Sequence, residues 1–347
     1  MAEKTGWGVI GSGGIAKRRT IPEGIAPASN ARLVSVYDVN AEINQAVADQ
    51  FGARAAASID ELLVSDIEAV YVATPVHLHY KHVMACAEAG KSVLCEKPLG
   101  MNPEEAERMI SVCAEKGVKL GSAFMMRFLA QHQEALKMVQ GGRIGKPTYA
   151  RAQLSCWYPP MEGAWRQKLG LGGGGSLIDM GGHCIDLLEM FFGKVKRVSC
   201  FANCTIHDYE AEDSAVAMLS FENGAIGTVD AFFCIPDNSS KNVLELYGSR
   251  GSILAKGTIG QGEAGVMVAF LEGDDAGYDA QQARAAGGGL AIAPPPVNTY
   301  RAEIEEFSQA LLENRDPQVG PEIGLRSQKI LTACYESAKT GKTIAIE

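Results

Sequence analysis

The pattern of apolar and polar residues changes near residue 126 and divides the chain into two parts. In the first part, short apolar runs alternate with longer amphipathic stretches. The apolar runs predict strands over residues 6–10, 32–37, 69–73, 92–95 and 118–123. The amphipathic stretches predict helices over residues 41–51, 80–89 and 103–116, the last with Asn102 as N-cap and Pro103 at its first position. This alternation predicts a doubly wound parallel sheet of the α/β class.

The second part begins with a predicted helix over residues 131–139 and then changes to closely spaced strands. The predicted strands cover residues 149–156, 195–205, 214–221, 225–233 and 241–248, with a second helix between the first two. Turns such as 222–224 indicate hairpins, and two helices over 299–313 and 320–339 close the chain. We therefore expect two domains, residues 1–126 and 127–347, the second an α+β domain with a large, open, mainly antiparallel sheet. Residues 273–296, rich in Gly, Ala and Pro, predict a loop or lid.

Composition narrows the classes of partner. With 347 residues, of which 46% are hydrophobic, the chain is long enough for two buried cores. Its 32 basic and 41 acidic residues give a net charge of -9, and no basic cluster is denser than residues 17–19. We therefore expect neither a nucleic acid nor a membrane as partner. The apolar segment 6–10 is too short for a secretory signal or a membrane span.

The cysteines suggest a compartment. Nine of them are scattered along the chain without a Cys-x-x-Cys pair, which indicates buried thiols in a reducing cytoplasm. A zinc site is the alternative, and we expect no metal.

The first predicted strand leads directly into a glycine-rich turn, Gly11-Ser12-Gly13-Gly14-Ile15-Ala16. It fits the G-x-G-x-x-G/A fingerprint of Rossmann domains, which bind a dinucleotide pyrophosphate at the N-terminus of the following helix. Gly11 permits the tight turn, Gly13 lets the backbone approach the pyrophosphate, and Ala16 lets the helix pack closely. The alternative is a tight strand–helix turn with no ligand.

Asp38 ends the second predicted strand, 27 residues after Gly11. A carboxylate at this place accepts hydrogen bonds from the adenosine ribose hydroxyls and repels a 2′-phosphate. NAD is therefore expected rather than NADP. The alternative is that Asp38 only begins a turn before Asn40.

A third element, Thr74-Pro75 followed by His79, stands at the end of a predicted strand, where open parallel sheets bind ligands. We expect it to turn the chain around the cofactor. His77, His79 and His82 resemble a metal cluster, but their spacing includes no fixed carboxylate partner, which argues against zinc.

Two further segments carry candidate chemistry. Glu96-Lys97-Pro98 follows the strand at 92–95, and an ammonium group there can stabilise an alkoxide that develops on a substrate hydroxyl. The alternative is a surface lysine.

The segment 172–186 contains Asp179 and His183 four residues apart and Asp186 one turn further on. If this segment is helical, the three side chains share a face, and a carboxylate beside an imidazole orients a general base. The alternative is a solvated polar face. Gly181 and Gly182 inside the helix indicate close approach by nicotinamide or by the other domain.

Taken together and in this order, the motifs resemble the glucose-fructose oxidoreductase / inositol dehydrogenase / MocA (Gfo/Idh/MocA) family over nearly the whole chain. The resemblance rests on the turn from Gly11, Thr74-Pro75 with His79, Glu96-Lys97-Pro98, Arg127, Trp165-Arg166, the segment from Asp179 to His183, and the closing helix through residues 333–338. It departs from the family at His77, where asparagine is usual, and at Met125 or Met126, where asparagine is frequent.

The resemblance implies residue roles. Lys97, Asp179 and His183 correspond to the family's catalytic residues. The expected cofactor-binding residues are Gly11, Ser12, Gly13, Gly14, Ile15, Asp38, Thr74, Pro75, His79, Glu96, Lys97 and Arg127. The expected substrate-binding residues are Lys97, Arg127, Tyr158, Trp165, Arg166, Asp179 and His183, with Asp186 a further candidate. The first domain would bind the dinucleotide and the second the substrate, and the open sheet would join subunits into a homodimer or homotetramer.

The leading hypothesis is an NAD-dependent oxidoreductase that moves a hydride between nicotinamide and a hydroxyl-bearing carbon of a sugar, cyclitol or glycoside. His183 would take the hydroxyl proton, Asp179 would orient His183, and Lys97 would polarise the oxygen. One alternative is a glycoside-processing or sugar–sugar oxidoreductase that retains its NAD and releases no NADH. A regulatory dinucleotide binder without catalysis is the other, and a zinc alcohol dehydrogenase fits the cysteine spacing poorly.

Overall fold

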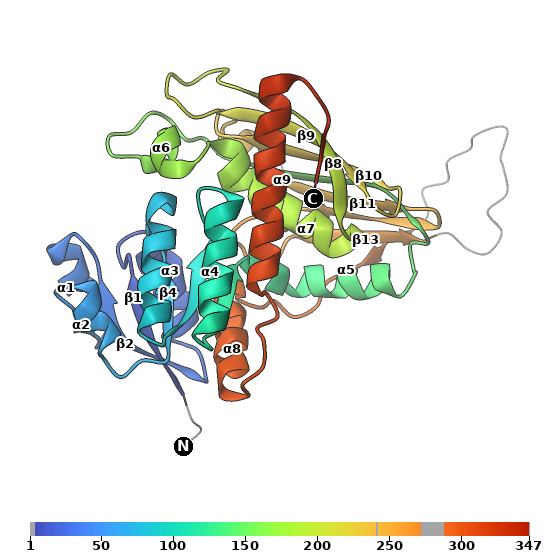
Figure 1. Cartoon of the computed structure of the whole chain (residues 1–347). Coiled ribbons are helices and arrows are strands. Elements are labelled where there is room, and N and C mark those ends of the chain that lie inside the picture. Colours follow the sequence, from blue (N-terminus) through green and yellow to red (C-terminus); the bar gives the residue numbers. More distant parts are fainter. Residues whose placement is uncertain (1–3, 241, 272–287, 347) are drawn as a thin grey trace, which may run out of the picture.

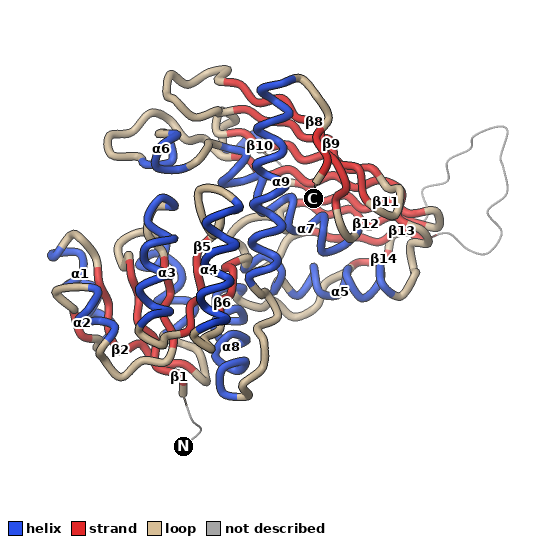
Figure 2. Tube along the Cα trace, in the orientation of Figure 1, coloured by secondary structure: helices blue, strands red, loops and turns tan. Residues whose placement is uncertain are grey.

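Two β-sheets, joined through helices, organise the chain (Figures 1 and 2). The computed structural model describes residues 4–240, 242–271 and 288–346. The parallel sheet and its helices lie at the lower left of Figure 1, and the large sheet lies at the upper right. The predicted combination of a doubly wound parallel sheet and a mainly antiparallel one is confirmed.

Within the described residues, six parallel strands form the first sheet in the order β3-β2-β1-β4-β5-β6. All residues of β1 and β4 are buried, as expected of strands covered by helices on both faces. The strands are β1 (Thr5–Ile10), β2 (Ala31–Tyr37), β3 (Arg54–Ala55), β4 (Ala69–Val72), β5 (Ser92–Glu96) and β6 (Leu120–Ala123). The helices are a π-helix over Ala16–Ile25, α1 (Ala41–Phe51), α2 (Ile59–Leu63), α3 (His79–Glu88) and α4 (Pro103–Glu115).

The large sheet has nine strands in the described part of the chain, in the order β14-β13-β12-β11-β7-β10-β9-β8-β15. Its pairs are antiparallel except that β7 and β10 run parallel. The strands are β7 (Pro147–Ser155), β8 (Val195–Asn203), β9 (Ser214–Phe221), β10 (Ile226–Phe232), β11 (Val243–Gly248), β12 (Gly251–Lys256), β13 (Val266–Leu271), β14 (Leu290–Ala291) and β15 (Ile344–Ala345).

In the part of the chain that the structure describes, helices cover one face of the large sheet and leave the other open (Figures 1 and 2). Along β9, buried residues alternate with exposed or half-buried ones, which is the pattern of a sheet with one covered face. The helices of this part are α5 (Ala130–Gln140), α6 (Leu169–Gly172), α7 (Gly182–Phe192), α8 (Thr299–Leu312) and α9 (Pro321–Thr340).

The sequence pattern missed the outer strands. It ended the sheet at Gly248, whereas β12, β13, β14 and β15 extend it on both sides. Two of these four have only two residues each, and a glycine-rich loop at 257–265 separates the other two, so none of them shows a long alternating run. Residues 241 and 273–287 of the predicted strand and loop lie outside the described residues.

All nine cysteines are free thiols. The expectation that all of them are buried was too broad. Cys204 is exposed, and Cys156 and Cys234 are half-buried.

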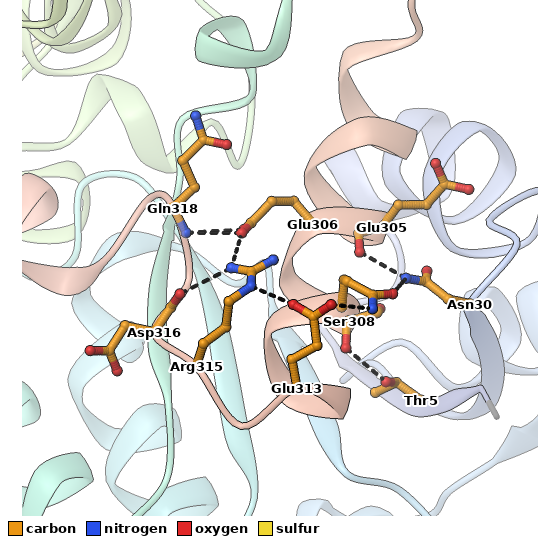
Figure 3. Close-up of polar contacts among 10 residues, drawn as sticks. Thr5, Asn30, Glu305, Glu306, Ser308, Glu313, Arg315, Asp316 and Gln318 are labelled. Carbon is orange, nitrogen blue, oxygen red and sulfur yellow. Dashed lines mark hydrogen bonds and ion pairs between the residues drawn. The ribbon is translucent and has the colours of Figure 1, made fainter.

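Helix α8 returns from the second part of the chain to the parallel sheet (Figure 3). The hydroxyl of Thr5 donates to the backbone oxygen of Ser308 at 3.4 Å, and the amide of Asn30 donates to the backbone oxygen of Glu305 at 2.9 Å. Phe307 packs with its ring centroid 5.5 Å from that of Trp7 in the buried core. The two parts therefore share a core element, which holds the cavity between them in place.

Candidate active site

A cavity of about 770 Å³ lies between the carboxyl ends of the parallel strands and the ends of the central strands β7 and β10 of the large sheet. From the first sheet, its lining residues include Gly14, Ile15, Arg18, Ala73, Thr74, His79, Glu96, Lys97, Met125 and Met126. From the second part, they include Ser155, Cys156, Tyr158, Trp165, Arg166, Asp179, His183, Phe233, Asp237, Asn242, Gln261 and Tyr300. Motifs far apart in the sequence thus meet in one place.

The glycine turn is built for close approach to a ligand. Gly11 has φ +88°, and a Cβ there would come within 2.8 Å of the Ala73 backbone. At Gly14, an added Cβ would meet no atom of the described chain within 4 Å, so the backbone there faces open space in the cavity. This cradle fits the pyrophosphate of a dinucleotide.

Asp38 is tied to the same turn. Its carboxylate accepts hydrogen bonds from the backbone N–H of Gly13 at 2.8 Å and of Asn40 at 2.9 Å. Asp38 therefore has the turn role that was the alternative, and its role toward the ribose hydroxyls stays a prediction. Ser12, expected to bind the cofactor, instead has a buried side chain whose hydroxyl contacts Asn44 at 3.3 Å.

His79 joins two loops of the site. Its Nε2 lies 2.8 Å from the backbone oxygen of Thr74, and its Nδ1 lies 2.9 Å from that of Pro98. Burial lowers the pKa of His79, although its contacts with the backbone oxygens of Pro98 and Thr74 oppose the shift. Among the described residues, no group of three or more His, Cys, Asp and Glu side chains is placed to hold a metal ion.

Lys97 reaches across from the end of β5 to the second part of the chain. Its Nζ donates to the Asp179 carboxylate at 2.9 Å and to the Asp179 backbone oxygen at 2.6 Å. The two side chains are 9% and 20% exposed, so solvent screens the pair only weakly. This ion pair links the loop after β5 to the π-helical segment of the second part of the chain.

Asp179 has a second cationic partner, Arg166, whose Nε lies 3.2 Å from the same carboxylate oxygen. Burial alone would raise the pKa of Asp179, but Arg166 and then Lys97 overcome this effect and hold it below its usual range. Asp179 is therefore an anion.

The segment that carries Asp179 packs closely against Glu212, and this close approach requires glycine at position 175. A Cβ at Gly175 would lie 1.9 Å from the backbone oxygen of Glu212. The Glu212 carboxylate accepts hydrogen bonds from the backbone N–H groups of Gly175 and Leu177, both at 2.8 Å, and from the hydroxyl of Tyr335 at 3.0 Å. Glu212 supports the site and was not predicted, because only the tertiary fold brings it there.

His183 lines the cavity, but its environment differs from the one expected. The residues from Leu177 to Gly181 form a π-helical turn, and Asp179 points to Lys97 and Arg166. The Nδ1 of His183 has no hydrogen-bond partner among the described residues. The expectation that Asp179 hydrogen-bonds to His183 and orients it is therefore wrong for this structure. Burial and the Lys97 ammonium lower the pKa of His183 well below its ordinary value, so its imidazole is neutral.

Arg127 and Asp186 pair with each other. The Nε of Arg127 donates to both carboxylate oxygens of Asp186, at 2.8 and 2.9 Å, and the Asp186 side chain is only 2% exposed. Neither residue lines the cavity. The roles expected for Arg127 in cofactor and substrate binding and for Asp186 in substrate binding are thus not supported, because a buried carboxylate needs this partner.

The other expected residues divide into two groups. Tyr158, Trp165 and Glu96 line the cavity, whereas Pro75 does not. Arg18, Asn242, Gln261 and Tyr300 line it without having been predicted. Arg18 belongs to the basic run beside the fingerprint, and that run was the one available signal. Asn242 and Gln261 come from loops and Tyr300 from the first turn of α8, and their placement depends on the fold.

Comparisons with known proteins agree with a Rossmann sheet followed by a second part built on the large sheet. Residues 5–124 match the family model described as "Oxidoreductase family, NAD-binding Rossmann fold", and residues 132–254 match the "GFO/IDH/MocA C-terminal domain". The 1,5-anhydro-D-fructose reductase of Ensifer adhaerens is 29% identical over 346 residues, 98% of either chain. The myo-inositol 2-dehydrogenase of Thermotoga maritima is 30% identical over 261 residues, 72% of this chain and 74% of its own.

Among solved structures, the aldose-aldose oxidoreductase of Caulobacter crescentus superposes with a TM-score of 0.87 at 26% identity, over 99% of this chain and all of its own. The fold and both halves of the site place this chain in the Gfo/Idh/MocA family of NAD(P)-binding oxidoreductases. In the part of the chain that the structure describes, no helix has the length and apolarity needed to cross a membrane.

Proposed function

We propose that the protein oxidises a hydroxyl-bearing carbon of a sugar, cyclitol or glycoside, reversibly and with NAD as hydride acceptor. The observation that carries the proposal is the Lys97–Asp179 ion pair beside a neutral His183, both facing the cavity that begins at the glycine turn. The named activities of the two relatives, on an anhydro sugar and on an inositol, support the substrate class.

Each residue has a distinct task in this proposal. Lys97 donates two of its N–H groups to Asp179. The third N–H group is then available to the oxygen of the reacting hydroxyl, where the ammonium stabilises the developing alkoxide. His183 is neutral and therefore able to accept the hydroxyl proton. Bound NAD would supply the site that takes up the hydride. Gly14 and Thr74 would hold the dinucleotide, and Tyr158 and Trp165 would contact the substrate.

A panel of inositols, free sugars and glycosides, assayed for NADH absorbance and for products, tests the proposal. We expect steady NADH formation with one class of polyol. Lys97→Met and His183→Asn should each lower turnover by about 100-fold or more, because each removes a group that acts on the reacting hydroxyl. Lys116→Met, at an exposed ion pair with Glu88, is the matched control.

Near-normal turnover in both site variants would refute the proposed roles. Product without NADH would instead favour the alternative in which the enzyme retains its NAD and passes the hydride between sugars, the kind of reaction that the name of the Caulobacter crescentus protein describes.

We propose NAD rather than NADP because the Asp38 carboxylate stands at the glycine turn, where it would repel a 2′-phosphate. Asp38→Asn keeps an oxygen able to accept the Gly13 N–H and removes the charge. We expect this variant to raise kcat/KM for NADP relative to NAD by about 10-fold or more. Asp49→Asn, at an exposed position of helix α1, is the control. An unchanged ratio in Asp38→Asn would contradict the assignment.

We also propose that the open face of the large sheet joins subunits. Phe201 and Val216 are opposite each other on β8 and β9, and both are exposed on this face, as is Met218. Such a cluster of apolar side chains marks an interface. Light scattering should show a dimer or tetramer that Met218→Asp dissociates, while Val64→Asp, exposed on the other domain, leaves it intact. A monomeric wild-type protein would disprove the interface.

A further inference from the structure

Arg166 is a cation of the cavity to which the proposed function gives no task. Its side chain is 31% exposed, and its Nε forms an ion pair with the carboxylate oxygen of Asp179 that Lys97 also contacts. The guanidinium carbon lies 4.2 Å from the ring centroid of Trp165. The ion pair and the contact with the aromatic ring hold the guanidinium in place.

The geometry on Asp179 makes the two cations interdependent. Lys97 and Arg166 approach one oxygen, at 2.9 and 3.2 Å, so the direction of the carboxylate is set by both. Without Arg166, the carboxylate would have a single cationic partner and could rotate with the flexible lysine side chain. The ammonium of Lys97 would then lose its fixed place, although the backbone oxygen of residue 179 would still accept one bond.

We propose that Arg166 is a positioning residue that fixes the Asp179 carboxylate and, through it, aims Lys97 at the reacting hydroxyl, rather than a residue that binds the substrate. Arg166 suits this task because its charge is permanent and its donors are rigidly placed, whereas a lysine presents a mobile point charge. Its stacking on Trp165 uses one face of the guanidinium, and the ion pair uses its Nε, so its main contacts are to the protein.

The inference rests on the proposed function, and it predicts a particular division between kcat and KM. Because Arg166 acts through Lys97, its loss should weaken an interaction made in the transition state while leaving substrate binding nearly unchanged. We expect Arg166→Met to lower kcat by about 10- to 100-fold with KM changed less than about threefold, and Arg166→Lys to recover part of kcat because it restores the charge.

A double-mutant cycle with Lys97 is the decisive experiment. Arg166→Met, Lys97→Met and the double variant are compared by single-turnover rates on the polyol found active. Thermal denaturation and NADH binding, followed by fluorescence, verify that each variant is folded. We expect the double variant to be within about threefold of Lys97→Met, because Arg166 has nothing left to position.

Multiplied losses in the double variant, or a raised KM with unchanged kcat in Arg166→Met, would overturn the inference and make Arg166 a substrate contact. Failure of the proposed function has a different signature, since Lys97→Met would then keep its turnover whatever Arg166 does. If Arg166→Met fails to fold, Arg166→Gln takes its place in the cycle, because it also removes the charge beside Asp179 and keeps a polar side chain.

Discussion

The ion pair between Lys97 and Asp179 is the contact on which the site depends. Its two members come from different parts of the chain, Lys97 from the loop after β5 and Asp179 from the π-helical turn, and both are largely withdrawn from water. Taking two charges from water costs free energy that only good geometry and further hydrogen bonds offset. The Asp179 backbone oxygen and Arg166 supply these further contacts. The pair therefore ties together the two sides of the cavity, which come from the two parts of the chain.

The surroundings of this pair shift the pKa values of the neighbouring groups. Burial raises the pKa of Glu96, next to Lys97, although a hydrogen bond from Tyr71 and the ammonium of Lys97 oppose the rise. Burial together with the same ammonium lowers the pKa of His183. A neutral imidazole beside a fixed cation is a suitable proton acceptor for a hydroxyl whose oxygen that cation stabilises.

The sequence was informative where local physics decides the structure. Asn102 caps α4 by accepting the N–H of Glu105 at 2.8 Å, as its position predicts, and the apolar run at β1 is wholly buried. The Gly11 turn has the positive φ that the fingerprint requires. Glycine, capping residues and long apolar runs act over a few neighbours, so their consequences are visible without the fold.

Long-range contacts were not predictable in the same way. The spacing of Asp179 and His183 suggested a shared helix face. In the structure, Asp179 lies in a π-helical turn and points to the two cations Lys97 and Arg166. The pairing of Arg127 with Asp186 joins residues 59 positions apart, and the support of Gly175 by Glu212 joins residues 37 apart. No periodicity in the sequence encodes such contacts.

The pH dependence of kcat/KM for alcohol oxidation, measured from initial rates, tests the central claim most directly. A base whose pKa is lowered in the folded protein stays neutral and active until the pH falls through that lowered value. With a neutral His183 held beside the Lys97 ammonium, kcat/KM should stay level as the pH is lowered through about 6.5, the ordinary pKa of histidine, and fall only well below it. An acid limb at pH 6.5 or above, absent in His183→Asn, would contradict the account.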